Sequence, residues 1–229
     1  MSHPSPTLFS RTERPFWRQR LNNPCFSFST LFFMVLPLAL LMLAIGLTSG
    51  FRGESIHIWH HDMRLFYPAL TRLFRAVSTG AAWVLYLVYA ILLVHAVARK
   101  NRHEQAFIAR FAFCLALVLS LAGILKITLG MPRPGVDMPA APFSFMNDFV
   151  SFPSGHTVQI VTAAFPLAFY FGRTWLFIAM SLLVTLIGYS RLWLGMHHPI
   201  DVLGGILVGS LIVVLIFRPK TGKNRLKRQ

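Results

Sequence analysis

The sequence predicts an all-α integral membrane protein, a bundle of six transmembrane helices, and three observations lead to this fold class. Of the 229 residues, 55% are hydrophobic, and the mean hydropathy is +0.59. The apolar residues form long, nearly uncharged blocks, whereas a soluble protein would spread them as periodic stripes facing a core. The 22 Lys and Arg residues, which dominate a formal net charge of +15, cluster beside these blocks.

Six apolar segments are candidate membrane spans, because about 20 helical residues cross the hydrocarbon core of a bilayer. In chain order they are residues 26–47, 77–98, 106–125, 157–171, 175–189 and 199–217. The first is longer than the apolar region of a signal peptide and no A-x-A site follows it, so we expect a retained anchor. The third contains Arg110, which can snorkel to the interface. The fourth is short, but residues 153–156 can extend it.

The distribution of Lys and Arg predicts the orientation. With a cytoplasmic N-terminus, the cytoplasmic side carries 15 of these 22 residues and the outer side carries seven. The positive-inside rule therefore places both termini in the cytoplasm. We expect one domain over residues 1–229, with basic cytoplasmic segments at 1–25 and 218–229, in the bacterial inner (plasma) membrane. Basic clusters beside apolar blocks suit anionic lipid headgroups, not nucleic acid.

Three short polar segments interrupt the apolar sequence near the ends of predicted spans. They are Lys126 with Arg133-Pro134, then Pro153-Ser154-Gly155-His156, and then Ser190-Arg191 followed by His197 and Asp201. An ionisable side chain at the centre of a membrane helix costs about 2.5–3.5 kcal/mol, so such residues are functional candidates. The predicted orientation places all three segments together on the outer side. We therefore expect an active site at the periplasmic or extracellular face.

The first property that these segments share is their suitability for binding phosphate. Positive charges and free backbone amides stabilise the non-bridging oxygens of a reacting phosphate ester. Lys126, Arg133 and Arg191 supply the charges. Ser154 and Gly155 add a hydroxyl and an accessible backbone at the expected N-terminus of a helix, which itself attracts anions.

Two histidines and one carboxylate can supply the chemistry. One neutral imidazole can attack phosphorus while the other protonates the leaving oxygen. Asp201 lies four residues after His197 and can hold that ring in the required tautomer. The adjacent His198 is an alternative nucleophile that the spacing disfavours. The sequence has neither zinc-site spacing nor a carboxylate cluster, so nothing in it indicates a metal ion or another cofactor.

In residue type, spacing and order, the three segments resemble the signature motifs of the type 2 phosphatidic acid phosphatase superfamily. That superfamily contains lipid phosphate phosphatases, prenyl pyrophosphate phosphatases and, more distantly, vanadium haloperoxidases. The resemblance implies that His197 is the nucleophile, Asp201 its orienting partner and His156 the general acid. It also implies that the reaction needs no metal ion. The residues that hold the phosphate would be Lys126, Arg133, Ser154, Gly155 and Arg191.

The sequence therefore predicts a lipid phosphatase that hydrolyses a phosphate monoester or pyrophosphate through a phospho-histidine. Phosphatidylglycerophosphate, phosphatidic acid, undecaprenyl pyrophosphate and lipid A 1-phosphate all suit such a site. Two alternatives remain: a lipid phosphotransferase with a prenyl pyrophosphate donor, and a non-enzymatic lipid-binding or transport protein with a residual anion site. No feature of the sequence indicates an oligomeric state.

Other expectations concern residues outside the motifs. Residues 57–75 predict an amphipathic helix along the outer surface. In this range, His57, His60, His61 and Asp62 could alternatively bind a metal ion. The loop 135–152 is rich in phenylalanine, and it either packs over the site or enters the outer leaflet and selects the lipid, with Phe145 and Phe149 as the test positions. The remaining candidates are packing residues: Gly205 and Gly209 between helices, and Cys25 and Cys114.

Overall fold

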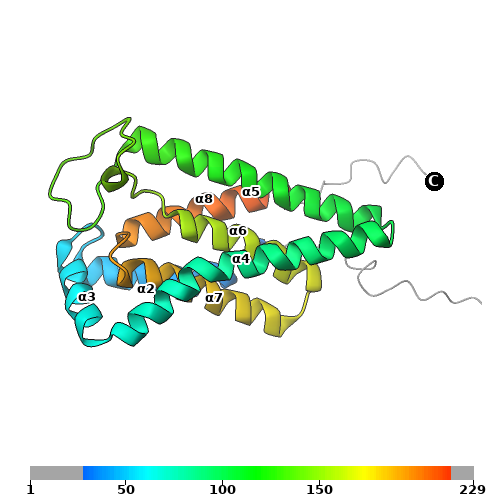
Figure 1. The fold of residues 1–229 in the computed structure, drawn as a ribbon, viewed down its shortest axis with the longest axis horizontal. Helices are drawn as coiled ribbons and strands as arrows, with labels where there is room; N and C mark the ends of the chain where they lie inside the picture. The colour runs from blue at the N-terminus through cyan, green and yellow to red at the C-terminus, as the bar shows by residue number, and fades with distance from the viewer. Residues whose placement is uncertain (1–27, 218–229) are drawn as a thin grey trace, which may run out of the picture.

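All regular structure within residues 28–217, the range that the computed structural model describes, is helical (Figure 1). The predicted basic segments 1–25 and 218–229, and with them Cys25, lie outside this range. The elements are α2 (Phe28–Ser49), α3 (Glu54–Phe66), α4 (Pro68–Ala98), α5 (Arg102–Leu129), the short 3₁₀ helix η1 (Asn147–Phe149), α6 (Gly155–Phe171), α7 (Thr174–Trp193) and α8 (Pro199–Phe217). The all-α prediction is confirmed for these residues.

Five of the helices, α2, α4, α5, α7 and α8, are long and apolar enough to cross a membrane. The fourth predicted span corresponds to α6, which has 17 residues and lies in the middle of the bundle against α5, α7 and α8 (Figure 1). Between Thr157 and Ala168 every residue except Gln159 is buried. Helix α6 is therefore the core of the bundle, and the other helices separate it from lipid.

Two glycines of α8 allow it to approach α6 closely. A Cβ on Gly205 would lie 2.8 Å from Cβ of Thr157 and 2.9 Å from the carbonyl oxygen of Ser154, and one on Gly209 would lie 3.3 Å from the carbonyl oxygen of Val158. A larger residue at Gly205 would push the two helices apart. The packing role predicted from the glycine spacing is confirmed, and it places the start of α8 beside the start of α6.

Two helices extend further than the predicted spans. Helix α5 continues to Leu129 and α7 to Trp193, so Lys126 and Arg191 lie in the last turns of these helices. Lys126 therefore lies at the end of its helix, as expected, whereas the expectation that Arg191 lies in the link between the fifth and sixth spans was wrong. Helix α5 ends only where Gly130 adopts a left-handed conformation, with φ of +51°. A cation in a final helical turn also interacts favourably with the helix dipole.

The prediction of a single surface helix over residues 57–75 was also wrong. Helix α3 ends at Phe66 and α4 begins at Pro68, with Tyr67 between them in a non-helical conformation (φ −123°, ψ 64°). Proline has no N–H to donate and its φ suits the first helical position, so it starts a new helix here. Only α3 packs as a short helix at this end of the bundle, against α7, α2 and α4.

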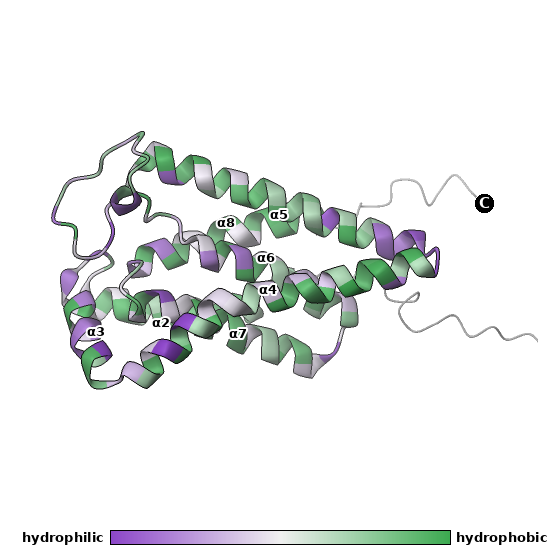
Figure 2. Ribbon diagram, viewed as in Figure 1, coloured by the Kyte–Doolittle hydropathy of each residue, from purple (hydrophilic) through white to green (hydrophobic). Residues whose placement is uncertain are grey.

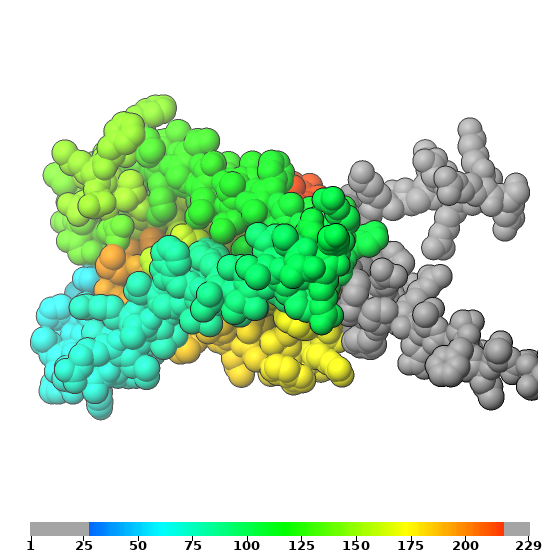
Figure 3. Space-filling view, turned by 45° about the vertical axis from the view of Figure 1, so that its right-hand side comes forward, coloured from blue at the N-terminus to red at the C-terminus, as the bar shows by residue number. Residues whose placement is uncertain are grey.

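Hydrophilic residues gather mainly towards the two ends of the bundle, as Figure 2 shows. One end carries α3 and the long loop between α5 and α6 (Figure 1). In the space-filling view of Figure 3, residues near the start of α8, in orange, are visible in the gap between α3, in cyan, and this loop, in green. All three predicted polar segments lie at this end, since α5 and α7 end there and α6 and α8 begin there.

Candidate active site

The second and third polar segments are joined backbone to backbone. The N–H of Ser154, at the start of α6, donates to the carbonyl oxygen of Asp201 in the first turn of α8 at 2.8 Å. Pro199 occupies the first position of α8, where a missing N–H is tolerated. The close approach at Gly205 keeps the two helix starts together. The N–H groups of Ile200, Asp201 and Val202 at the start of α8 donate to backbone carbonyl oxygens, so the amide groups that favour an anion here are those at the start of α6.

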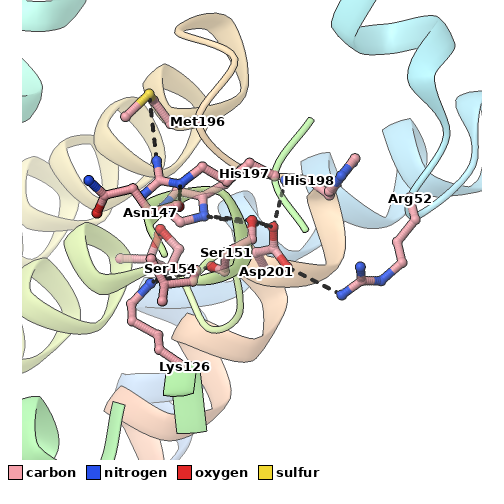
Figure 4. A network of polar contacts seen from close by, with 12 residues as sticks. Arg52, Lys126, Asn147, Ser151, Ser154, Met196, His197, His198 and Asp201 are labelled. Carbon is pink, nitrogen blue, oxygen red and sulfur yellow. Dashed lines mark hydrogen bonds and ion pairs between the residues drawn. The ribbon is translucent and has the colours of Figure 1, made fainter. Parts of the chain in front are cut away.

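Asp201 is the centre of a polar network (Figure 4). The side chain is fully buried, and its Oδ2 accepts hydrogen bonds from the hydroxyl of Ser151 at 2.6 Å and from the N–H of His198 at 2.8 Å. Nδ1 of His197 lies 3.7 Å from the same oxygen, and the guanidinium of Arg52 lies 3.8 Å from Oδ1. A buried carboxylate requires such partners, because an isolated charge is costly to bury.

His197 belongs to the link between α7 and α8 and is buried beside this carboxylate. Its Nδ1 lies 3.4 Å from the hydroxyl oxygen of Ser151. Burial lowers the pKa of His197 to about 4, although Asp201 acts in the opposite direction. The ring is therefore neutral at pH 7, the form in which an imidazole nitrogen can act as a nucleophile. Since Nδ1 faces Ser151 and Asp201, Nε2 is the nitrogen available for attack.

Lys126 reaches the start of α6 from the end of α5. Its ammonium group donates to the carbonyl oxygen of Val150 at 2.6 Å, and its Cε lies 3.8 Å from the position that a Cβ would take on Gly155. These contacts hold the Lys126 side chain against the backbone at Gly155, which the sequence predicted to bind phosphate. Three donors are available on an ammonium group, so Lys126 retains capacity for an anion.

Arg191 and Arg133 approach from the end of α7 and from the loop between α5 and α6. Arg191 is 6% exposed and donates to the hydroxyl of Ser78 at 3.0 Å, while its Nε has no hydrogen-bond partner within residues 28–217. Arg133 donates from Nε to the carbonyl oxygen of Asn147 at 2.7 Å. These bonds orient each guanidinium without neutralising it.

No carboxylate in residues 28–217 forms an ion pair with any of the three cations, Lys126, Arg133 and Arg191. Buried cations are normally paired or bound to a ligand, because burial without a counter-charge is unfavourable. The charges of all three act on the half-buried ring of His156, in the first turn of α6. A group of cations around a histidine, without matching anions, is an arrangement that suits a bound phosphate.

Helix α3 forms a wall beside these residues. Arg64 donates to the carbonyl oxygen of Trp193 at 2.5 Å, and Nε2 of His60 lies 3.2 Å from the hydroxyl of Tyr189. Burial lowers the pKa of His60 to about 4, so its ring is neutral at pH 7. The contacts join α3 to the end of α7, next to the link that carries His197.

The alternative of a metal site on α3 finds no support. Over residues 28–217, no three His, Cys, Asp or Glu side chains are placed to hold a metal ion. His60 is 1% exposed and contacts the aromatic rings of Tyr189 and Trp193, whereas His61 is exposed and lies 3.5 Å from Asp62. Because His60 points into the bundle and His61 lies on the exposed side of the helix, the two side chains do not converge.

Three residues of this network were not predicted from the sequence: Ser151, Arg52 and Ser78. Ser151 lies two residues before Pro153 in the second polar segment, so its position next to a motif was an available signal. Arg52 belonged to the outer-side charges but lies far from the motifs in the sequence. Ser78 had no signal, since a serine in an apolar span is common and only the packing of α4 against α7 brings it to Arg191.

Comparisons with known proteins decide the family. The profile of the PAP2 superfamily matches residues 107–225, more than half of the 229-residue chain, and the match contains every predicted site residue. The chain belongs to the PAP2 superfamily. Its resemblance to type 2 phosphatidic acid phosphatases, inferred from three motifs, is confirmed.

Similar PAP2 proteins have been named as phosphatases. The chain is 25% identical over 195 residues to an undecaprenyl-diphosphatase of Sulfolobus acidocaldarius, covering 81% of this chain and 86% of that protein. It is 39% identical over 108 residues to a lipid A 1-phosphatase of Rhizobium johnstonii, 42% of each chain. This PAP2 protein is therefore a phosphatase, and the non-enzymatic alternative is not supported.

A solved PAP2 structure has the same fold. The crystal structure of the first transmembrane PAP2 type phosphatidylglycerolphosphate phosphatase from Bacillus subtilis superposes with a TM-score of 0.51 at 23% identity, covering 82% of this chain and 92% of that one. Together with five apolar helices of membrane-spanning length within residues 28–217, this likeness identifies an integral membrane PAP2 protein.

Proposed function

We propose that this PAP2 protein hydrolyses the phosphate monoester or pyrophosphate of a membrane lipid through a phospho-histidine on His197, without a metal ion. The observation that carries the proposal is the convergence of three unpaired cations with two histidines at one end of the bundle. Lys126, Arg133 and Arg191 would neutralise the phosphate, and the neutral His197 would lie within the field of Lys126 and Arg191. Five different parts of the fold supply these groups, namely the end of α5, the loop after it, the start of α6, the end of α7 and the link to α8, so their convergence is not a local feature of one helix.

The proposed reaction assigns one task to each group. Nε2 of His197 forms a bond to phosphorus as the bond to the leaving oxygen breaks. His156, protonated once the negative charge of the bound phosphate offsets the three surrounding cations, transfers a proton to that oxygen. Asp201 stabilises the positive charge that develops on His197. His156 then takes a proton from water, whose oxygen attacks the phospho-histidine and releases phosphate. The amides of Ser154 and Gly155 and the three cations stabilise the charge on phosphorus in both steps.

We also propose six membrane spans, cytoplasmic termini and a site at the outer face of the bacterial inner membrane. Five helices meet the length and composition of a span, and α6 would be the sixth, short because it is enclosed by protein. The excess of Lys and Arg on the opposite side supports this orientation. Labelling of cysteines introduced at exposed positions 138 and 103 with an impermeant reagent tests it, since only position 138 would react in intact cells.

A substrate panel on detergent-purified protein tests the function. We expect phosphate release from one or more of undecaprenyl pyrophosphate, lipid A 1-phosphate, phosphatidylglycerophosphate and phosphatidic acid, undiminished by a chelator. Undecaprenyl pyrophosphate is the first choice, because an undecaprenyl-diphosphatase is similar over most of the chain. Failure to release phosphate from any of these lipids would contradict the proposal. Transfer of labelled phosphate to an added lipid acceptor, in preference to water, would instead identify a phosphotransferase.

The loop between α5 and α6 offers a test of lipid selection. Phe143 and Phe145 are 72% and 81% exposed, so both can enter the outer leaflet, whereas Phe149 is only 9% exposed and packs inside. Phe149 therefore does not suit the role predicted for it. We expect Phe143→Ser with Phe145→Ser to lower kcat/KM on a lipid substrate about 5- to 10-fold, because apolar contacts with acyl chains are lost. Activity on p-nitrophenyl phosphate should remain unchanged.

A matched control uses Phe171, which is 40% exposed at the opposite end of α6. Phe171→Ser should leave the ratio of lipid to soluble activity at the wild-type value. Equal losses on both substrates in the loop variant would show that these phenylalanines support the fold of the site and do not select lipid.

A further inference from the structure

Ser151 occupies a position where all three polar segments meet. It is completely buried, and its N–H donates to the carbonyl oxygen of Met131 at 3.0 Å. Its own carbonyl oxygen lies 3.5 Å from the ammonium group of Lys126. Its hydroxyl contacts Asp201 and His197. The backbone of Ser151 is thus held by the end of α5 and the residues after it, while its side chain points at the proposed nucleophile (Figure 4).

The distances indicate that the contact between the carboxylate and the imidazole passes through this hydroxyl. Oδ2 of Asp201 and Nδ1 of His197 are 3.7 Å apart, longer than a hydrogen bond, while the Ser151 oxygen lies 2.6 Å from the first and 3.4 Å from the second. A hydroxyl has one proton, and an ionised carboxylate can only accept. Ser151 therefore donates to Asp201 and presents a lone pair to Nδ1.

A lone pair facing Nδ1 specifies the tautomer of His197. Of the two neutral tautomers, only the one with a proton on Nδ1 can donate to Ser151. In that tautomer the lone pair of the ring lies on Nε2, the nitrogen that faces away from Asp201. The N–H of His198, at 2.8 Å from the same carboxylate oxygen, further restricts the orientation of Asp201.

We propose that Ser151 is a positioning residue, which holds Asp201 and selects the Nδ1-protonated tautomer of His197. The inference rests on the proposed function, in which Nε2 of His197 attacks phosphorus. As the N–P bond forms and the P–O bond breaks, the proton stays on Nδ1 and the ring becomes positive. The hydroxyl lone pair and the carboxylate behind it stabilise that charge. The leaving oxygen takes its proton from His156, so Ser151 itself gains and loses none.

The role predicts a particular kinetic defect. Removing the hydroxyl leaves Lys126, Arg133 and Arg191 in place, so phosphate binding should be retained. In the transition state, where the His197 ring becomes charged, the ring is then no longer oriented by the hydroxyl. We expect Ser151→Ala to lower kcat about 10- to 100-fold, by analogy with the range found when hydrogen-bond partners of metal-ligating histidines are removed. KM should stay within about 3-fold of wild type, since an interaction lost only in the transition state lowers kcat alone.

The experiment compares Ser151→Ala and Ser151→Cys with a matched control, on p-nitrophenyl phosphate and on the best lipid of the panel. Cysteine has nearly the shape of serine but is a weak donor, so it tests the hydroxyl if the alanine variant fails to fold. The control is Ser181→Ala, because the hydroxyl of Ser181 donates to the carbonyl oxygen of Met34 away from the site. It should retain wild-type kcat and KM.

The outcomes separate the inference from the proposed function. A matching fall in kcat on both substrates, with KM retained and a melting temperature close to wild type, supports the role of Ser151. Wild-type kcat in the folded Ser151 variants, or a rise in KM with kcat retained, overturns it. If those variants are fully active while His197→Ala is inactive, the inference fails and the proposed function stands. If His197→Ala is fully active, the proposed function fails as well.

Discussion

We expect His197→Ala to lower turnover at least about 10⁴-fold on every substrate, because it removes the proposed nucleophile and no neighbouring group can take its place. The His197 ring is buried at the network around Asp201, so replacement also leaves that carboxylate without one partner. Steady-state phosphate release from purified protein measures the loss. Acid quenching with a labelled substrate should trap phosphate on the wild-type chain and none on the variant.

His198→Ala is the matched control, since His198 is the adjacent and equally buried histidine. Its backbone N–H, which binds Asp201, survives the substitution. We expect this variant to retain measurable turnover and to trap phosphate. If labelled phosphate is trapped on the His197→Ala protein and none is trapped on the His198→Ala protein, the roles of the two histidines are reversed.

The same histidine predicts the acid side of the pH profile. Burial lowers the pKa of His197 to about 4, and only the neutral ring has a lone pair for phosphorus. The neutral form predominates above this pKa, so kcat/KM should be retained as the pH falls towards 5. It should then decline as the pH falls through about 4, after correction for ionisation of the substrate. A decline centred near 6.5, the value of an unperturbed histidine, would contradict this assignment.

The second large effect is expected for His156→Ala. A general acid typically contributes about 10²- to 10⁴-fold, and a lipid phosphate monoester such as phosphatidic acid needs it because its alkoxide is a poor leaving group. p-Nitrophenolate is a stable anion that leaves without a proton. In the first turnover, measured by rapid mixing, we therefore expect a loss of at least about 100-fold on the lipid and below about 10-fold on p-nitrophenyl phosphate.

His103→Ala controls for the loss of a histidine, because His103 is exposed at the start of α5, at the other end of the bundle. It should match wild type on both substrates. If His156→Ala slows the first turnover equally on the two substrates, its role is binding or orientation of phosphate, and another group donates the proton.

Much of the fold could be read from hydropathy, but the helix ends could not. Hydropathy detects apolar blocks, and Lys126 and Arg191 were placed outside them because they are charged. The helices continue through both residues, since a helix ends where the backbone requires it, as at Gly130 with its positive φ. The break between α3 and α4 at Tyr67 was also missed from the sequence. Pro68 was a local signal for it, but the amphipathic pattern of residues 57–75 obscured that signal.

The sequence by itself determined the class of reaction, that of a phosphatase, because charged and nucleophilic residues in an apolar chain are few and the spacing of three motifs is specific. It determined the family, and it predicted the groups for phosphate and the division of labour between His156 and His197. Only the tertiary structure decided how Asp201 is held, since Ser151 and Arg52 reach it from other segments through distances that no local spacing encodes. Only packing distinguished the buried Phe149 from the exposed Phe145, because burial depends on what the rest of the chain places around a residue.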